Sequence, residues 1–230
     1  MFDSLNGWAL NTSLDQLYQC ENGIWKLTVK PVDAEYIEIF GFSKNNLWLG
    51  CLGNKTYRYF FRHFNGIKWH NIYPPNSDRI RELVFIAPDN IWGACEWGEI
   101  IHYDGREWQL ISNPTFGHLN SIAFVNDSLG WAIGEYRSHS ILLKWNGKKW
   151  NKMKSFDHLP LGNIFMVNSK IGCVFTTTNT SMALHVEGDQ ISYVNFANLV
   201  KDSIFCSFDF YKNPLVFFPN RMVIQGGNIA

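Results

Sequence analysis

A tryptophan that follows a polar turn recurs along this chain at intervals close to 40 residues. The four clear copies read DSLNGWAL, KNNLWLG, PDNIWGA and NDSLGWAIG. Weaker copies, NSKIGCVF and YKNPLVFF, place Cys173 and Val216 at the tryptophan position. Self-similarity at such a period is typical of repeat architectures, so we infer that copies of one small structural unit build the chain. The tryptophans are Trp8, Trp48, Trp92 and Trp131, separated by 40, 44 and 39 residues.

A second motif, a tight turn followed by another tryptophan, also occurs once in each unit. It reads CENGIW, HFNGIKW, HYDGREW and KWNGKKW, and it weakens to HVEGDQI in the fifth unit. Asn-Gly and Asp-Gly between alternating apolar runs indicate a β-hairpin, because a type I′ turn needs positive φ at both central residues. We therefore expect type I′ turns here. The tryptophans after the turns are Trp25, Trp69, Trp108 and Trp150.

Each unit contains the material for four short strands. Apolar runs such as IRELVFI, LNSIAFV and NIFMV are typical of strands that are buried on both faces. They precede the tryptophan strand, which is followed by a strand ending in the turn and by an outer strand with the second tryptophan. Nothing in the chain has the pattern of a helix of useful length. Units of four strands repeated about every 42 residues predict an all-β fold, a β-propeller of five to six four-stranded blades.

The repeat extends over the whole sequence, so we expect a single propeller domain over residues 1–230. Because the chain opens on the second strand of a unit and stops near the third strand of a sixth, six blades would lack two strands and five would leave strands over. Three explanations remain open: the sequence is a segment of a longer protein, the seam is imperfect, or a partner chain or further domain completes the edge. The expected units are approximately 1–34, 35–78, 79–117, 118–159, 160–200 and 201–230.

Two neighbouring units carry a resemblance to known repeats. DNIWGACEWGEIIHYDGREW and DSLGWAIGEYRSHSILLKWNGKKW resemble a bacterial propeller repeat of the form D-x-W-x-x-G followed by h-x-x-D-G-x-x-W. They are distantly similar to the BNR or Asp-box repeats of sialidase-like and photosystem-assembly-like propellers. Four units match well and two weakly, so the resemblance covers nearly the whole chain. It implies the propeller fold, which hosts many different functions.

Composition narrows the choice of partners. Twenty basic and twenty acidic residues give a formal net charge of zero, which disfavours nucleic acid and anionic membranes as partners. No segment approaches the roughly 18 apolar residues of a membrane span, and the N-terminus lacks the regions of an export signal. Neither the five cysteines nor the seven histidines have metal-ligand spacing, so we expect no metal and no cofactor. Reduced thiols favour the cytoplasm, although a fragment of a secreted chain would look the same.

The stretch IIHYDGREW brings His102 and Asp104 close together, and both are common catalytic residue types. Other units place His63, Lys144 and His185 at the position of His102, and asparagine at the position of Asp104. A catalytic group is usually unique in a ring of repeats. We therefore interpret both residues as structural, with the Asx residue favouring the turn conformation.

The units differ most in the connection after each tryptophan strand, which reads CLGNKTYRYF, CEWGEI, GEYRSHS and TTTNTS. In a propeller these connections gather on one face beside the central channel, the usual place for ligands on repeat folds. We expect a protein partner or a small ligand to bind there, the alternative being an ordinary solvated rim. The candidate ligand-binding residues are Tyr57, Arg58, Glu96, Trp97, Glu135, Tyr136, Arg137, His139 and Asn179.

Two functions from different classes fit this face. A non-catalytic binding or scaffolding propeller needs only exposed side chains of varied chemistry. The alternative is a propeller glycosidase or lyase that uses the paired carboxylates Glu96 and Glu135, which come from adjacent blades. Arginine is scarce near this face, with only Arg58 and Arg137, and no G-x-S-x-G, H-E-x-x-H or phosphate-binding glycine loop occurs. The sequence therefore favours the binding module, without catalytic residues.

Overall fold

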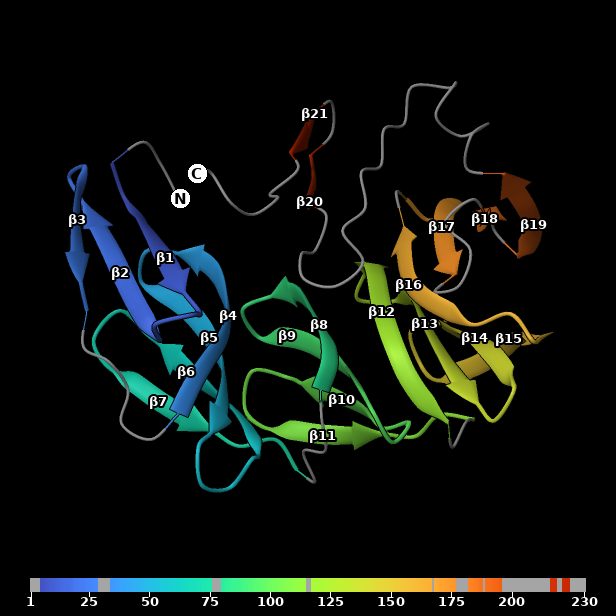
Figure 1. The fold of residues 1–230 in the computed structure, drawn as a ribbon, viewed down its shortest axis with the longest axis horizontal. Coiled ribbons are helices and arrows are strands. Elements are labelled where there is room, and N and C mark those ends of the chain that lie inside the picture. Colours follow the sequence, from blue (N-terminus) through green and yellow to red (C-terminus); the bar gives the residue numbers. More distant parts are fainter. Residues whose placement is uncertain are drawn as a thin grey trace.

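The chain folds into antiparallel sheets that stand side by side around a central space, and the ring of sheets is not closed (Figure 1). The fold is thus the expected all-β propeller with four-stranded blades. Every regular element of the described residues is a strand. None of these residues forms a helix able to cross a membrane. The computed structural model describes residues 5–28, 34–75, 80–114, 117–166, 168–176, 182–187, 189–195, 216–218 and 221–223.

The first sheet has three strands, four sheets have four strands each, and the last pair of strands forms a hairpin. Within each sheet the strands follow one another in chain order. The strands are β1 (Gly7–Asn11), β2 (Gln16–Glu21) and β3 (Ile24–Leu27); β4 (Ala34–Ser43), β5 (Asn46–Gly53), β6 (Tyr59–Phe64) and β7 (Trp69–Ile72); β8 (Ile80–Ala87), β9 (Asn90–Cys95), β10 (Ile100–Tyr103) and β11 (Trp108–Ile111); β12 (His118–Asn126), β13 (Leu129–Tyr136), β14 (His139–Trp145) and β15 (Trp150–Asp157); β16 (Leu161–Met166), β17 (Ile171–Thr176), β18 (Met182–Glu187) and β19 (Gln190–Asn195); β20 (Val216–Phe218) and β21 (Arg221–Val223).

In each four-stranded sheet the first strand lies nearest the central space and the fourth lies at the periphery (Figure 1). The tryptophan of the first motif is on the second strand, as Trp48 on β5 and Trp92 on β9 show. Trp8 lies on β1, so β1 corresponds to the second strand of a blade. The three-stranded sheet therefore begins one strand late, as the sequence predicts.

Each inner strand contains a β-bulge at the same place. The register of β4, β8 and β12 with the following strand shifts just before Glu38, Glu82 and Ser121. A bulge leaves one residue out of the ladder and bends the strand, so side chains beside it can leave the regular pattern of the sheet. These three residues therefore hold equivalent positions near the axis of the propeller.

Aromatic side chains fill the space between neighbouring sheets. Trp48 packs edge to face on Tyr103 of the next sheet, with ring centroids 5.0 Å apart. Trp92 lies 4.9 Å from Trp145 and 6.1 Å from Trp150, both of the next sheet. The first four sheets thus present the tryptophan of the first motif to the sheet that follows in the chain. Trp25 of the second motif differs, since its side chain is exposed.

The turns of the second motif differ from the expectation in three sheets. Asn22 and Gly23 both have positive φ and join β2 to β3 as the expected two-residue turn. In the next three sheets only the glycine has positive φ, and the connection has four residues, so the type I′ prediction is wrong there. The Asx side chain accepts hydrogen bonds from the two N–H groups beyond the glycine, which stabilises the longer turn. The Asx residues are Asn65, Asp104 and Asn146.

His102 has the structural role expected of it. Its Nε2–H donates to the side-chain oxygen of Asn90 at 2.9 Å, and its ring stacks on Trp92 with centroids 4.1 Å apart. His63 makes the same two contacts in the preceding sheet, with Asn46 and Trp48. Burial lowers the pKa of both imidazoles, which favours their neutral form.

Candidate functional site

Strands alternate in direction, so the connection between the second and third strands of a sheet lies at the same end as the residues after its fourth strand. We call this end of the described sheets the connection face. It carries residues 54–58, 96–99 and 137–138, together with the described residues that directly follow the fourth strand of a sheet. All predicted site residues except Asn179 lie in or directly beside these connections, and Asn179 is outside the described residues.

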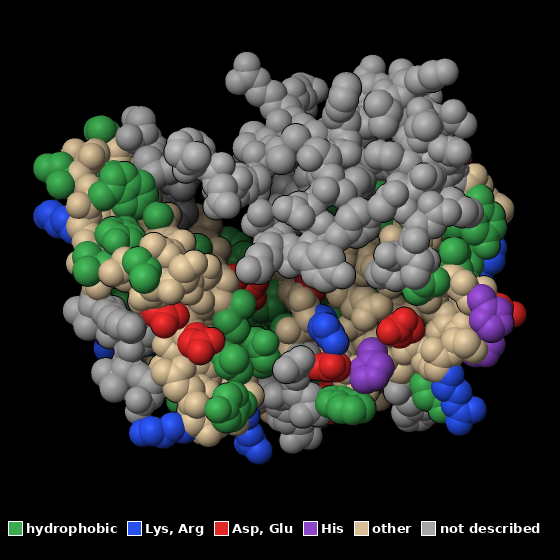
Figure 2. All heavy atoms as spheres, in the orientation of Figure 1, with side chains coloured by type: hydrophobic (Ala, Val, Ile, Leu, Met, Phe, Trp, Pro, Cys, Tyr) green, Lys and Arg blue, Asp and Glu red, His purple; other side chains and the backbone are tan. Residues whose placement is uncertain are grey.

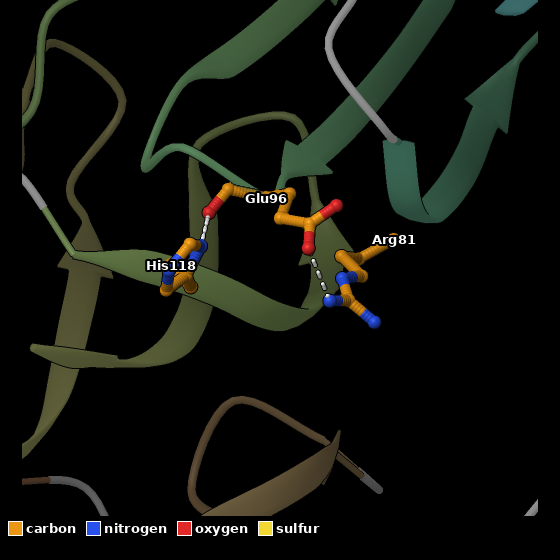
Figure 3. A network of polar contacts seen from close by, with 3 residues as sticks. All are labelled: Arg81, Glu96 and His118. Atoms are coloured by element: carbon orange, nitrogen blue, oxygen red, sulfur yellow. Dashed lines mark hydrogen bonds and ion pairs between the residues drawn. The ribbon is translucent and has the colours of Figure 1, made fainter. Parts of the chain in front are cut away.

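Glu96 belongs to a polar network with Arg81 and His118 that joins two sheets (Figure 3). The carboxylate of Glu96 accepts a hydrogen bond from the guanidinium of Arg81 at 2.8 Å. On the other side of the same residue, the backbone carbonyl of Glu96 accepts a hydrogen bond from Nδ1–H of His118. The His118 ring also lies 5.0 Å from that of Trp97, and His118 is opposite Glu135 in the β12–β13 ladder.

The remaining predicted residues form contacts of their own. The guanidinium of Arg137 lies over the ring of Tyr136, 5.2 Å from its centroid. His139 Nδ1 is 2.7 Å from a carboxylate oxygen of Asp157, within the same sheet. Arg58 and Tyr57 close their own connection through backbone hydrogen bonds with Gly53. The candidate residues therefore share one face in separate small groups, and the carboxylate of Glu96 is engaged by Arg81.

Large side chains occupy strained backbone positions in two of these connections. Gly98, between β9 and β10, has φ +84°. In the corresponding connections of the neighbouring sheets, the residues with left-handed backbone are Tyr57 (φ 51°) and Arg137 (φ 57°). A residue with a Cβ is uncommon in this region, and such strain often coincides with functional sites. Glycine would relieve the strain, so these positions present a large side chain at a cost to stability.

The same face carries aromatic side chains that the fold does not bury. Tyr57 is 78% exposed, Tyr73 66%, Trp97 62% and Tyr136 44%, whereas Trp48 between the sheets is fully buried. Tyr73 follows β7 and stacks on Phe60 at 5.3 Å. Exposed aromatic side chains on one face are typical of interaction sites, since they combine large contact area with low conformational entropy.

A cavity of about 290 Å³ opens between β4 and β8, beside the central space. Figure 2 shows the hollow near the middle of the described surface, with acidic side chains at its border. The cavity was not predicted from the sequence, because EYIEIF and IRELVFI look like ordinary buried strands. Aligning the inner strands would have revealed a glutamate at the same position in both. The lining residues are Ile37, Glu38, Gly50, Tyr59, Phe61, Ile80, Arg81, Glu82 and Leu83.

Two carboxylates face this cavity. Glu82 accepts a hydrogen bond from the backbone N–H of Ile122 at 2.8 Å and another from the Ser121 hydroxyl, yet burial outweighs both bonds and raises its pKa to about 7. Burial, together with the nearby charge of Glu82, raises the pKa of Glu38 to about 7 as well. Gly50 gives Glu38 its room, because a Cβ at residue 50 would lie 2.8 Å from Glu38 Cγ. In the part of the chain that the structure describes, no group of three or more His, Cys, Asp or Glu side chains could hold a metal ion.

Comparison with known proteins gives the fold. No family model matches the chain. No curated protein matches it either. Among solved structures it is similar to YCF48 bound to D1 peptide, with a TM-score of 0.58 and 14% identity over 85% of this chain and 65% of that one. The chain thus spans less than two thirds of that structure.

Two enzymes also have similar structures. One is an ancestral GH74 enzyme, with a TM-score of 0.60 and 11% identity over 84% of this chain and 31% of that one. The other is virginiamycin B lyase from Staphylococcus aureus, with a TM-score of 0.58 and 11% identity over 82% of this chain and 66% of that one. At such identities the likeness shows the propeller fold, and the fold alone hosts both binding proteins and enzymes.

Proposed function

We propose that this chain is a non-catalytic binding propeller that recognises a segment of a partner protein on its connection face. The observation that carries the proposal is the group of exposed aromatic side chains there, Tyr57, Tyr73, Trp97 and Tyr136. Aromatic residues that stand out from a rigid scaffold supply most of the binding energy in many protein interfaces. The sheets beneath them form such a scaffold, because buried tryptophans pack the outer parts of the blades together.

The backbone of the connections supports a recognition role. Tyr57 and Arg137 keep left-handed φ values that cost about 1–3 kcal/mol each relative to a relaxed residue. The ring of Tyr136 and the guanidinium of Arg137 lie against each other, which limits their motion before a partner arrives. Preorganised side chains lose less entropy on binding, so these contacts favour affinity.

A peptide is the kind of partner we favour. One propeller of similar structure, YCF48, has been solved with a D1 peptide. Catalysis has less support in the site, since Arg81 engages the carboxylate of Glu96 that a glycosidase or lyase would need beside Glu135.

Binding of the purified protein to a library of random short peptides, measured with single variants, tests the proposal. Trp97→Ala and Tyr57→Ala should each weaken binding at least about tenfold, as expected of exposed interface anchors. The matched control is Ile67→Ala, because Ile67 is 87% exposed in the turn at the opposite end of the blade. Binding by both connection-face variants at the wild-type level, or an equal loss in Ile67→Ala, would refute the proposal.

A further inference from the structure

The cavity between β4 and β8 contains two carboxylates that no ion pair of the described residues neutralises. Glu38 makes neither a hydrogen bond nor an ion pair with a described residue, and the hydrogen-bond donors to Glu82 are neutral. The only guanidinium in the lining, that of Arg81, is held by Glu96 at 2.8 Å. The lining therefore contains two carboxyl groups and one guanidinium, and Glu96 already pairs with that guanidinium.

At the next two interfaces between sheets, the residues equivalent to Glu38 accept a hydrogen bond from the following sheet, which Glu38 does not. Glu82 accepts a hydrogen bond from the backbone N–H of Ile122 in the next sheet at 2.8 Å. Ser121 accepts the corresponding bond from Ile164 at 3.1 Å. Glu38 holds the same place after the bulge of β4, yet it faces the cavity and makes no such bond to the described residues of β8. The fold itself thus gives no reason for a carboxylate at this position.

The cavity has the size and the lining for one long basic side chain. Its volume of about 290 Å³ is at the lower end of the range of ligand pockets, about 300–1,000 Å³. Ile37, Phe61 and Leu83 provide apolar surface for the methylene stem of a lysine or arginine. The carboxylates of Glu38 and Glu82 would then face the cationic end, where charge-assisted hydrogen bonds are strongest.

The cavity also lies within the connection face. Tyr59 and Arg81 line it, and they stand at the strand ends of that face. Tyr57 precedes Tyr59 by two residues, and Glu96, which binds Arg81, is followed by Trp97. Two of the exposed aromatic residues are therefore close in sequence to residues that line or border the cavity, so a peptide held by them could direct one side chain into it.

We propose that the cavity between β4 and β8 receives a lysine or arginine side chain of the bound peptide, with its cation between Glu38 and Glu82. The inference rests on the proposed function and adds a sequence requirement to it. Specificity arises because a neutral or acidic side chain in this place would leave the two carboxylates unpaired or repelled.

Four pools of short peptides with random flanks test the inference, the central residue being lysine, arginine, norleucine or glutamate. The wild-type protein should bind the lysine and arginine pools at least about tenfold more tightly than the norleucine pool, since norleucine keeps the stem and lacks the charge. Glu38→Gln and Glu82→Gln should reduce that preference at least about fivefold. The amide oxygen introduced by Glu82→Gln can still accept the hydrogen bond from Ile122. Thermal unfolding checks that both variants stay folded.

Two further variants separate this inference from the proposed function. Glu35→Gln is the matched control, because Glu35 is exposed on the same strand as Glu38, and it should keep the preference. Trp97→Ala should weaken all pools alike and leave the ratio between them unchanged. Binding of all pools without preference, or a preference that survives Glu38→Gln and Glu82→Gln, overturns the inference alone. Absence of binding to every pool overturns the proposed function with it.

Discussion

Two neighbouring interfaces between sheets use the same repeat in different ways. We call the interface between β4–β7 and β8–β11 the first seam, and the interface between β8–β11 and β12–β15 the second seam. Their outer parts match: Phe61 stacks on Trp108 at 5.0 Å in one, and Trp92 packs on Trp145 and Trp150 in the other. Near the axis they differ. Glu82 bonds to the backbone of Ile122 across the second seam, whereas the first opens into the cavity that Glu38 faces.

In this difference the same repeat position makes a hydrogen bond in one seam and faces a cavity in the other. The outer tryptophans hold neighbouring sheets together, so the inner strands need not touch along their whole length. Where the hydrogen bond between inner strands is absent, the side chain at the same position faces the cavity, where we propose that a ligand binds. Three predictions test whether the two seams are packed alike at the periphery and differ near the axis of the propeller.

The largest effect should come from the buried tryptophans, and it should be equal in the two seams. Trp48→Ala and Trp92→Ala should each lower the free energy of unfolding by about 3–5 kcal/mol, because each leaves a large void among aromatic neighbours. Urea denaturation measures both, with Trp97→Ala as a control that changes stability little, since its ring is mostly exposed. A much smaller loss in Trp48→Ala would mean that the cavity weakens the whole first seam.

Glycine to alanine substitutions should separate the packed core of the first seam from its cavity, with effects of intermediate size. At residue 93 a Cβ would lie 2.8 Å from Ile101 and 3.0 Å from Leu83, both packed in the core, so Gly93→Ala should cost about 1–3 kcal/mol. At residue 50 the close atoms belong to Glu38, whose flexible side chain can move into the cavity. Gly50→Ala should therefore cost less than Gly93→Ala in thermal or urea unfolding. Equal losses would show that Glu38 is fixed.

The smallest effect is a dependence of stability on pH at the first seam. The native pKa of Glu38 is raised to about 7 from an ordinary value of 4.5, so the folded protein holds the proton more tightly than the unfolded chain. Stability from this group is complete below pH 4.5 and declines as the pH rises towards 7. Glu38→Gln should therefore raise the melting temperature by about 2–4 °C at pH 8, which corresponds to about 1 kcal/mol, and change it little at about pH 5.

The exposed Glu35→Gln variant controls for the change in net charge and should show no such difference between the two pH values. Arg81, Glu82 and Tyr59 also face the cavity, so the double variant with Glu82→Gln reports how far the two carboxylates act together. A melting temperature of Glu38→Gln that rises equally at both pH values would contradict the proposed ionisation.

The architecture could be predicted from the sequence because large side chains and turn residues recur at a nearly constant spacing. Trp48, Trp92 and Trp131 are recognisable by spacing alone, and they mark the second strand of each of their blades. The turn geometry was predicted less well, since Asn65 and its equivalents accept two backbone hydrogen bonds that lengthen the turn. Whether the Asx side chain accepts these backbone hydrogen bonds depends on the number of residues in the loop, and the Asn-Gly pair alone does not determine that number.

The candidate site was predicted only in part. The connections identified Glu96 and Trp97, but Arg81 and His118, which contact them, lie at the starts of inner strands and carry no local signal. Glu38 and Glu82 were hidden for a different reason. Their orientation depends on bulges in β4 and β8, and a bulge alters which face of the sheet a residue occupies without changing the apolar pattern around it.

The direction in which the tryptophans face has a consequence during synthesis. Each of the first four sheets presents its tryptophan strand to the sheet that comes after it in the chain, as Trp8 does with Trp69 and Trp48 with Tyr103. When a nascent chain leaves the ribosome, the most recent complete blade has an uncovered aromatic face until about 42 further residues have emerged. The growing protein therefore exposes one aromatic blade surface at a time, and each newly completed blade covers the previous surface and exposes its own.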